Sequence, residues 1–391
     1  MPILFSDVTV VPMDGAPQVL EHAYVAVEGT KIASVGTEPP EGTFDRVVDG
    51  AGKVLLPGFV NAHTHLPMTL MRGYGGGCDL HTWLNQYIFP AEARLDSRAV
   101  AAGAGLGLAE MIASGVTCVA DMYMHTGTIA EQILEAGISA NLSCGGVYFG
   151  APEDFSPETC GDCRNQAALT EEWHGAGAGQ ILVDASVHGE YTSNPPLWRW
   201  MAEYAAEHRL GMHVHVSETQ SEHQASLERW GKTPIQALDG CGVWDCGRSL
   251  AAHCVYTTEE DWALMAEKGI SCVHNPWSNL KLGSGVAPIP AMMRAGVNVA
   301  LGTDGMSSHN SADLFSDIKL AAVLHNGVER DPMAVNAWAA LEMATVNGAR
   351  ALGRDTGVIA PGKTADLILV DLSAPKLIPC HDPVEDLVFS A

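Results

Sequence analysis

Positive charge is scarce in this sequence. Lysine and arginine together number 21 among 391 residues, against 46 aspartates and glutamates, so the formal net charge at pH 7 is −25. A negative field of this size repels the phosphate backbone of nucleic acids and the headgroups of anionic membranes. We therefore predict no nucleic-acid partner and no membrane partner.

Long apolar runs are also missing. No stretch approaches the roughly 20 apolar residues that a transmembrane helix needs. The start of the chain, Met1–Phe5, lacks a basic region followed by a long apolar stretch, and Asp7 and Asp14 come too early for a signal peptide. We therefore expect a cytoplasmic protein.

Cysteine is too dilute for a disulfide scaffold, because the ten cysteines are scattered along the chain. Cys118, Cys254 and Cys272 lie in apolar, strand-like segments, which favours buried free thiols. Cys160 and Cys163 have the spacing of a redox or zinc pair, but no second pair follows at zinc-ribbon distance. We assign this pair no function.

The two ends of the chain are rich in β-strand patterns. Leu4–Val11 alternates loosely, Ala23–Val27 and Lys31–Val35 flank a turn in the manner of a hairpin, and Ala365–Asp371 is strand-like. We predict one small β-sandwich domain from residues 1–57 and 356–391. More strands are expected near Val384–Val388, and one interpretation is that the carboxyl-terminal part of this domain is truncated.

Between these ends, short apolar strands alternate with longer helical stretches such as Ala99–Ala113 and Leu197–His208. Near-continuous apolar strands that alternate with helices indicate a parallel sheet. Eight such units predict an α/β fold with a (β/α)8 barrel, similar to a TIM barrel, over residues 58–355. The eight predicted strands are Leu55–Asn61, Val116–Asp121, Ser139–Ser143, Ile181–His188, Gly211–Val216, Ser249–His253, Ser271–His274 and Asn298–Gly302.

Polar residues gather where four of the predicted strands end. Asn61–His65 holds two histidines two residues apart, which places both on the same side of an extended segment. His213–Glu218, Ala251–His253 and Gly302–Gly305 end three other strands. Because the active site of a barrel enzyme lies at the carboxyl ends of its strands, we expect these side chains to converge.

A metal ion is the simplest explanation of this convergence. A single histidine at a strand end is more often a hydrogen-bonded core residue than a ligand, but four strand ends with the same chemistry make that interpretation poor. Neutral imidazoles with a carboxylate suit zinc, or alternatively iron(II). We predict a divalent metal site, with Zn²⁺ as the ion and Fe²⁺ as the alternative.

Several segments resemble a known family. Pro57–His65 is similar to the strand-one signature of the amidohydrolase superfamily. His274–Gly285 and Gly302–Gly305 resemble one branch of it, the methylthioadenosine/S-adenosylhomocysteine deaminases and their chlorohydrolase relatives. Gly357–Leu367 matches the family's return to its sandwich domain, so the resemblance covers nearly the whole chain.

The resemblance implies a role for each polar residue at the strand ends. It implies that one divalent metal ion is held by four residues: His63, His65, His215 and Asp304. Asp304 also accepts a proton from the attacking water, His253 orients that water, and Glu218 carries the proton to the ring nitrogen of the substrate. The alternative for Glu218 is a solvated residue at a helix start, but its spacing from His215 favours catalysis.

The resemblance also bears on the number of metal ions. Two-metal members of the superfamily use a carboxylated lysine on strand four as a bridge between the ions. The segment Ile181–His188 contains no lysine. This favours a mononuclear site and deamination over the chemistry of ureases, phosphotriesterases and dihydropyrimidinases.

Further residues are implied as substrate contacts. His188 stands where the family places a substrate-binding histidine, although Val187–Tyr191 departs from the usual motif, which implies a different pocket wall. Glu92, with Trp83 and Pro90 nearby, matches a glutamate that binds ribose hydroxyls. A carboxylate can accept hydrogen bonds from both hydroxyls of a diol. The alternative for Glu92 is a residue on a helix surface.

The 5′ end of the substrate is implied by two positions. Arg164 aligns with one of two family arginines that bind the carboxylate of S-adenosylhomocysteine, and a forked guanidinium suits that group. The other position holds Cys144. Half of the clamp is therefore missing, which favours an uncharged 5′ group, as in adenosine, methylthioadenosine or 5′-deoxyadenosine.

Three hypotheses follow. The first is a hydrolase of carbon–nitrogen bonds that converts an adenosine-like nucleoside, with S-adenosylhomocysteine as a further candidate, to the inosine analogue and ammonia. The second is a deaminase or chlorohydrolase of another N-heterocycle, such as guanine, an oxidised purine or a triazine, which would not depend on ribose hydroxyls. The third, an inactive barrel acting as an assembly partner, is opposed by the retained ligands. The family implies a homo-oligomer, either dimer or tetramer.

Overall fold

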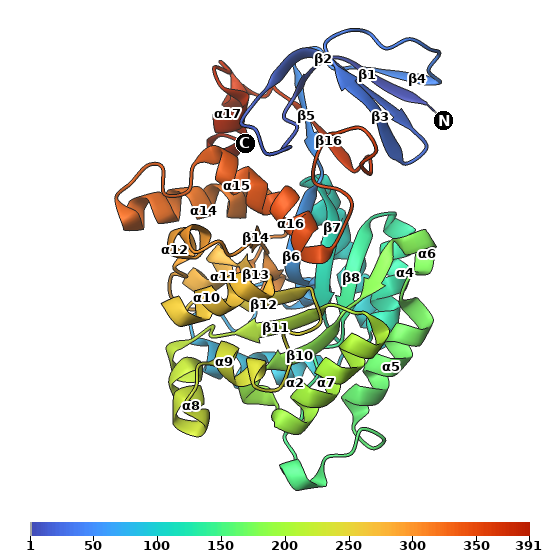
Figure 1. Ribbon diagram of the computed structural model, residues 1–391. Helices are drawn as coiled ribbons and strands as arrows, with labels where there is room; N and C mark the ends of the chain where they lie inside the picture. Colours follow the sequence, from blue (N-terminus) through green and yellow to red (C-terminus); the bar gives the residue numbers. More distant parts are fainter. Residues whose placement is uncertain (1) are drawn as a thin grey trace.

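The computed structural model describes residues 2–391 and contains three β-sheets (Figure 1). Two are parallel sheets of five strands each, with the orders β15-β6-β7-β8-β9 and β10-β11-β12-β13-β14. The third is a mixed sheet of six strands, in which β4 pairs with β1 beside the path β16-β5-β1-β2-β3. Long helices alternate with the parallel strands along the chain, so the predicted parallel α/β organisation is confirmed.

The strands fall into three groups. The first parallel sheet contains β6 (Phe59–His65), β7 (Val116–Met122), β8 (Ser139–Ser143), β9 (Ile181–Val183) and β15 (Asp304–Gly305). The second contains β10 (Ala185–Gly189), β11 (Met212–Val216), β12 (Ser249–His253), β13 (Ile270–His274) and β14 (Val299–Leu301). The mixed sheet contains β1 (Ile3–Val10), β2 (Leu20–Glu28), β3 (Lys31–Gly36), β4 (Arg46–Asp49), β5 (Lys53–Pro57) and β16 (Leu367–Asp371).

Helices connect the parallel strands and follow the last of them. In chain order they are α1 (Leu80–Trp83), α2 (Phe89–Glu92), α3 (Ser97–Ala113), α4 (Thr126–Ala136), α5 (Gly161–Trp173), α6 (Ala176–Gly179), α7 (Pro195–His208), α8 (Gln220–Trp230), α9 (Pro234–Asp239), α10 (Glu259–Lys268), α11 (Pro276–Lys281), α12 (Ile289–Arg294), α13 (Met306–His309), α14 (Leu314–Glu329), α15 (Ala337–Ala344), α16 (Val346–Leu352) and α17 (Pro383–Phe389). Shorter helical turns are η1 (Leu66–Met71), η2 (Leu84–Ile88), η3 (Pro152–Asp154), η4 (Glu190–Thr192) and η5 (Pro375–Leu377).

Side chains from both parallel sheets meet in one buried cluster. Its members alternate along the strands, as do Val60 and Ala62 of β6 and Cys118 and Ala120 of β7. The second sheet contributes Leu250, Val273 and Ala300. Because successive side chains of a strand point to opposite faces, this alternation turns one face of each sheet toward the other.

A buried aspartate divides the predicted strand Ile181–His188 into β9 and β10. The carboxylate of Asp184 accepts hydrogen bonds from the Asn141 side chain at 2.8 Å and the Gly211 backbone at 3.2 Å, and it forms an ion pair with Arg248. A buried carboxylate needs such partners. The apolar pattern of the sequence predicts the strand but not the break that these contacts produce.

A glycine separates the mixed sheet from the first parallel sheet. The single strand predicted at Leu55–Asn61 is wrong, because the structure has two strands there, β5 and β6, in different sheets. Gly58 lies between them, and a Cβ atom at this position would stand 2.2 Å from the hydroxyl oxygen of Thr117. The close approach of the Thr117 side chain to the Gly58 backbone therefore requires glycine.

Both ends of the chain build the mixed sheet, drawn at the top of Figure 1 in blue, with the later β16 in red. β2 and β3 form the predicted hairpin, in which Glu28 pairs with Lys31. The predicted strand Ala365–Asp371 contains β16, which pairs antiparallel with β5. Within residues 2–391, the strands outside the parallel sheets thus form one sheet.

The two long helices predicted from the sequence are present, and each begins two residues earlier than predicted. α3 contains the predicted segment Ala99–Ala113, and the Asp96 side chain caps it by accepting a hydrogen bond from the Ala99 backbone. α7 contains the predicted segment Leu197–His208. Further strands were expected near the end of the chain, but Asp382 caps α17 there instead. Within residues 2–391, no helix combines the length and apolar character that crossing a membrane requires.

Candidate active site

Four side chains from three strands form a compact cluster. His63 and His65 lie on β6, His215 lies on β11, and Asp304 begins β15. The Oδ1 atom of Asp304 lies 3.5 Å from Nε2 of His63 and 3.2 Å from Nε2 of His65. Nε2 of His215 lies 3.4 Å from Nε2 of His65. The structure therefore brings together the four residues that were predicted to bind a metal ion.

Backbone carbonyl groups orient two of these imidazoles. Nδ1 of His65 donates to the Met122 carbonyl oxygen at 2.5 Å, and Nδ1 of His215 donates to the His188 carbonyl oxygen at 2.5 Å. Because a carbonyl oxygen can only accept, each Nδ1 carries the proton, and the lone pair of each neutral ring is on Nε2. Such contacts fix the rings of metal-binding histidines.

The cluster fits a divalent metal ion. Within residues 2–391, the buried Nε2 atom of His63 has no hydrogen-bond partner, which is an unfavourable state for a buried polar atom. The donor atoms of His63, His65 and Asp304 lie within 4.8 Å of one another, and so do those of His63, His215 and His253. Imidazole nitrogens with a carboxylate oxygen form a donor set suited to zinc or iron(II).

Burial and neighbouring charges set the protonation of the cluster. Burial lowers the pKa of His63 and His215 well below the usual value. Burial also acts to lower the pKa of His65, but Asp304 raises it to about 9. The pKa of Asp304 is held well below its usual range by His63 and His65, although burial acts in the opposite direction. Metal binding would therefore displace a proton from His65.

Backbone strain marks two of the strand ends. Asp304 has φ 60° and His253 has φ 75°, in the left-handed region that side chains other than glycine seldom adopt. Such conformations persist where the surrounding structure imposes them, and they cluster at functional sites. Hydrogen bonds to Oδ2 of Asp304 come from the hydroxyls of Ser278 at 2.5 Å and Ser308 at 3.0 Å. These bonds leave Oδ1 facing the histidines.

Glu218 and His253 lie side by side after β11 and at the end of β12. Oε2 of Glu218 is 3.7 Å from Nε2 of His253, and Nδ1 of His253 donates to Oδ1 of Asn279 at 2.8 Å. Burial raises the pKa of Glu218, which favours the protonated carboxyl group. A buried carboxyl group beside an oriented imidazole can carry protons to and from a bound molecule.

Glu222 positions Glu218 and was not identified from the sequence. Its two carboxylate oxygens accept backbone hydrogen bonds from Ser217 at 2.8 Å and from Glu218 at 2.7 Å. The sequence holds a partial signal, because Thr219 and Glu222 have the spacing of a helix start. That spacing predicts the start of α8 but not the contact with Glu218.

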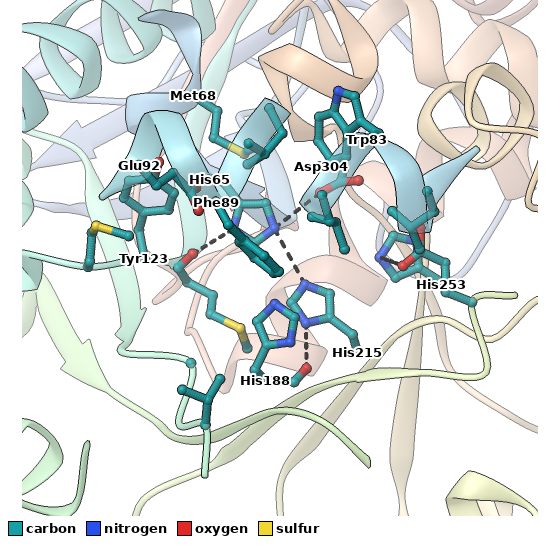
Figure 2. A pocket seen from close by; sticks show the side chains of 18 of the residues that line it. His65, Met68, Trp83, Phe89, Glu92, Tyr123, His188, His215, His253 and Asp304 are labelled. Carbon is teal, nitrogen blue, oxygen red and sulfur yellow. Dashed lines mark hydrogen bonds and ion pairs between the residues drawn. The ribbon is translucent and has the colours of Figure 1, made fainter. Parts of the chain in front are cut away.

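These groups open into a cavity of about 300 Å³ (Figure 2), near the lower end of the range typical of small-molecule sites. The cavity is lined by predicted residues from other elements, namely Trp83, Glu92 and His188. Figure 2 shows His188 next to His215, and Glu92 beside Tyr123 and His65. Burial lowers the pKa of His188 to about 4, so this ring is neutral near pH 7.

The segment that carries Trp83 and Glu92 is locally irregular. A single π-helical turn, η2, separates α1 from α2, and such turns are frequent at functional sites. The indole nitrogen of Trp83 donates to the Tyr74 carbonyl oxygen at 3.3 Å. Burial raises the pKa of Glu92, while Tyr123 and His65 oppose this shift. A position on the cavity wall argues against Glu92 as a helix-surface residue.

Comparison with known proteins now identifies the family. The sequence pattern of the amidohydrolase family matches residues 54–391. The chain belongs to the amidohydrolase family. It is 42% identical to the 5-methylthioadenosine/S-adenosylhomocysteine deaminase of Moorella thermoacetica, over 100% of this chain and 90% of that protein. It is 41% identical to the 5′-deoxyadenosine deaminase of Methanothermobacter thermautotrophicus, over 95% of this chain and 86% of that protein.

A solved structure agrees over the whole chain. The crystal structure of an adenosine deaminase from Xanthomonas campestris with bound zinc has a TM-score of 0.92 and 35% sequence identity to this amidohydrolase. The match covers 100% of this chain and 89% of that chain.

The structure does not bring Arg164 to the cavity of this amidohydrolase. The side chain is exposed on α5, and Nη1 donates to the Glu158 carbonyl oxygen at 3.1 Å. The expected carboxylate contact therefore has no geometric support. Arg164 follows Asp162 by two residues, which turns the two side chains about 200° apart around the helix axis. It is Asp162 that lines the cavity. The Asp162 carboxylate accepts a hydrogen bond from the Val147 backbone at 2.8 Å.

His213 is a buried neighbour of the amidohydrolase cluster to which the sequence analysis assigned no role. Its Nε2 atom lies 2.8 Å from Nδ1 of His63. His213 precedes His215 by two residues on β11, so both side chains point to the same face of the strand. This alternation in the sequence is the signal that could have identified His213 as a neighbour of the metal-binding residues. His213 therefore orients His63 as carbonyl groups orient His65 and His215.

We expect His213→Ala to weaken metal binding by about 10- to 100-fold, because His63 loses the partner that orients its ring. Metal content after dialysis against a graded series of chelator concentrations measures this change. His208→Ala, which alters a histidine on the exposed end of α7, is the control. Equal metal retention by the two variants would show that His213 has no such role.

Proposed function

We propose that this amidohydrolase is a metal-dependent hydrolytic deaminase that converts an adenosine-like nucleoside to the inosine analogue and ammonia. The observation that carries the proposal is the position of Glu218 and His253 beside the imidazole–carboxylate cluster, in the same cavity as Glu92. The identity to the Moorella and Methanothermobacter deaminases over nearly the full chain supports the same substrate class. Adenosine, methylthioadenosine, 5′-deoxyadenosine and S-adenosylhomocysteine are the candidate substrates.

The metal site of the proposal comprises His63, His65, His215 and Asp304. We favour Zn²⁺ over Fe²⁺, since the similar adenosine deaminase from Xanthomonas campestris contains zinc. A single ion is proposed because the segment 181–188 contains no lysine. When bound, a divalent ion supplies Lewis acidity that makes water a nucleophile near neutral pH.

The protein's own groups account for the remaining chemistry. Hydrolytic deamination adds water to the ring carbon that carries the amino group and then breaks the carbon–nitrogen bond, so that ammonia leaves. Asp304, held by two serine hydroxyls, accepts a proton from the attacking water. His253, held by Asn279, orients that water. Glu218 delivers a proton to the neighbouring ring nitrogen, which makes the carbon a better electrophile.

Glu92 binds the ribose hydroxyls in this proposal, and Trp83 and His188 form walls of the cavity. We expect Glu92→Gln to lower kcat/KM for adenosine about 10- to 100-fold, mainly through KM, because a hydrogen bond to a charged group contributes about 1.5–3 kcal/mol. The effect should vanish with 2′,3′-dideoxyadenosine, which lacks both partners. Steady-state ammonia release from both nucleosides measures it. Equal losses with the two nucleosides would contradict a ribose contact.

Ammonia release from a panel of amines tests the function itself. The panel contains adenosine, methylthioadenosine, 5′-deoxyadenosine, S-adenosylhomocysteine, guanine and cytosine, with zinc-loaded protein. Turnover of the adenosines supports the proposal. Preference for guanine, or turnover that is indifferent to the ribose hydroxyls, would favour a deaminase of another N-heterocycle. Absence of turnover throughout the panel would exclude adenosine-like substrates.

The proposal includes the architecture. We propose that the two parallel sheets form one closed (β/α)8 barrel over residues 58–355. Residues 1–57 and 356–391 then form a second domain, in which the single mixed sheet folds over on itself as a small β-sandwich. Three features support closure: only Asp184 separates β9 from β10, only Gly302 and Thr303 separate β14 from β15, and β15 pairs with β6. The buried cluster shared by both sheets also supports it.

The assembly and location of the enzyme stay predictions from the sequence. We predict a homodimer or homotetramer, a cytoplasmic location, and no nucleic-acid or membrane partner. The retained donor set opposes an inactive assembly partner, because all four predicted metal-binding side chains face one another.

A further inference from the structure

The catalytic cavity has an end that the proposed chemistry does not use. Met124, Cys144 and Asp162 line both this cavity and an adjoining hollow of about 490 Å³. The hollow lies between the start of α4 and one face of α5, with Asn165 and Glu172 farther along that face. These three residues form the boundary between the two spaces, so the Asp162 carboxylate stands at the end of the cavity that borders the hollow.

Strand order places this opening across the cavity from the catalytic pair. Glu218 and His253 stand at the ends of β11 and β12 in one parallel sheet, whereas Met124 and Cys144 follow β7 and β8 in the other. A nucleoside whose amino group lies between Glu218 and His253 thus directs its opposite end toward Asp162. This step rests on the proposed function, in which that opposite end is the 5′ substituent.

The opening carries negative charge without a compensating cation. The Asp162 carboxylate accepts hydrogen bonds from the Val147 backbone at 2.8 Å and from the Asn165 amide at 3.4 Å, and both donors are uncharged. Glu172 adds a second carboxylate to the hollow. Within residues 2–391, no lysine or arginine lines either space. His125 also borders the hollow, and its Nδ1 lies 3.2 Å from the Ser97 hydroxyl.

We propose that Asp162 is a specificity-determining residue that admits neutral and cationic 5′ substituents and disfavours anionic ones. Like charges repel strongly in a partly enclosed space, and an ammonium group near Asp162 and Glu172 is attracted for the same reason. This differs from the loss of an arginine clamp. Without the arginine clamp, a substrate carboxylate only loses a favourable interaction. Asp162 adds an electrostatic repulsion to that loss.

Three adenosine thioethers of matched length isolate the charge of the substituent: 5′-propylthio, 5′-(2-aminoethyl)thio and 5′-carboxymethylthio derivatives. We expect the wild-type kcat/KM for the amine to exceed that for the carboxylate by at least about tenfold. Asp162→Asn should reduce this ratio about tenfold and change kcat/KM for the propyl compound less than about threefold. Glu172→Gln should give a smaller change of the same sign, and Arg164→Ala should give none.

Binding of the same three compounds, measured by calorimetry, tests charge selection apart from turnover. The proposal is overturned if Asp162→Asn leaves the ratio of the amine to the carboxylate unchanged, whether in kcat/KM or in Kd. It is also overturned if the wild type accepts the carboxylate as well as the amine, because Asp162 then does not select against negative charge. Failure of all three compounds to react, with charge-ordered binding retained, would reject the proposed function and leave Asp162 as the selector.

A second measurement tests the proposal without Asp162→Asn, in case that variant does not fold. With the wild-type protein, a higher ionic strength should lower the ratio of kcat/KM for the amine to kcat/KM for the carboxylate. Salt screens the charges at a partly exposed opening. A ratio that is independent of salt would count against Asp162.

Discussion

Glu218→Gln is expected to lower kcat for nucleoside deamination by about 10²- to 10⁴-fold while the metal content stays unchanged. The amide has nearly the same shape as the carboxyl group, so the packing at the end of β11 is retained. The amide cannot deliver a proton to the ring nitrogen of the substrate, however, although it keeps its position 3.7 Å from His253. The loss should fall on kcat rather than KM.

Ammonia release under steady-state conditions, with metal analysis of the same samples, measures this effect. Glu228→Gln is a matched control. Glu228 is an exposed residue of α8, the helix that begins two residues after Glu218. A fall in kcat of less than about threefold for Glu218→Gln would remove Glu218 from the chemistry. Lost metal would indicate a structural role instead.

Removal of the divalent ion is expected to reduce activity by at least about 10³-fold, with recovery on addition of Zn²⁺. The buried Nε2 atom of His63 gains a partner when a cation binds, and the ionised Asp304 offers a carboxylate oxygen to the same cation. Because the ion binds the folded state, zinc should also raise the melting temperature in a concentration-dependent manner.

Two variants separate metal binding from catalysis. His215→Ala should lose both the activity and the zinc-dependent rise in melting temperature, whereas Glu218→Gln should lose only the activity. Differential scanning fluorimetry across a zinc titration gives the second readout without any turnover. A full thermal response to zinc in His215→Ala would show that the cluster is not the metal site.

The fold was predictable from the sequence where apolar runs are continuous and uninterrupted. The residues of β12 and β13 are buried throughout, and each of these strands contains an uninterrupted apolar stretch, Leu250–Ala252 in β12 and Cys272–Val273 in β13. Two breaks were not predictable. Asp184 depends on partners such as Arg248 that are distant in sequence, and Gly58 depends on the approach of Thr117. Both are tertiary contacts, which a local pattern does not record.

The candidate site was predictable where side chains alternate at strand ends. His63 and His65 project from one face of β6, so the sequence itself places them together. The opposite holds for Arg164 and Asp162, because a shift of two residues along α5 exchanges an outward side chain for an inward one. His213 contacts the ring of His63 on a strand of the other parallel sheet, and Glu222 contacts the backbone of Glu218. The spacing of these residues indicates a strand face and a helix start, but it does not predict these contacts.

The pairing of β5 with β16 has a consequence for the order in which the protein is completed during synthesis. Leu55 pairs with Leu369, so β5 lacks this neighbouring strand until residue 369 has left the ribosome, more than 300 residues after β5 has been made. The formation of the metal cluster is delayed in the same way, because Asp304 is synthesised about 240 residues after His63, which it faces in the folded protein. During this interval β5 has an unpaired edge, and the metal site lacks one of its ligands. Unpaired strand edges favour aggregation. Chaperone demand during expression should accordingly rise with slower elongation beyond His65.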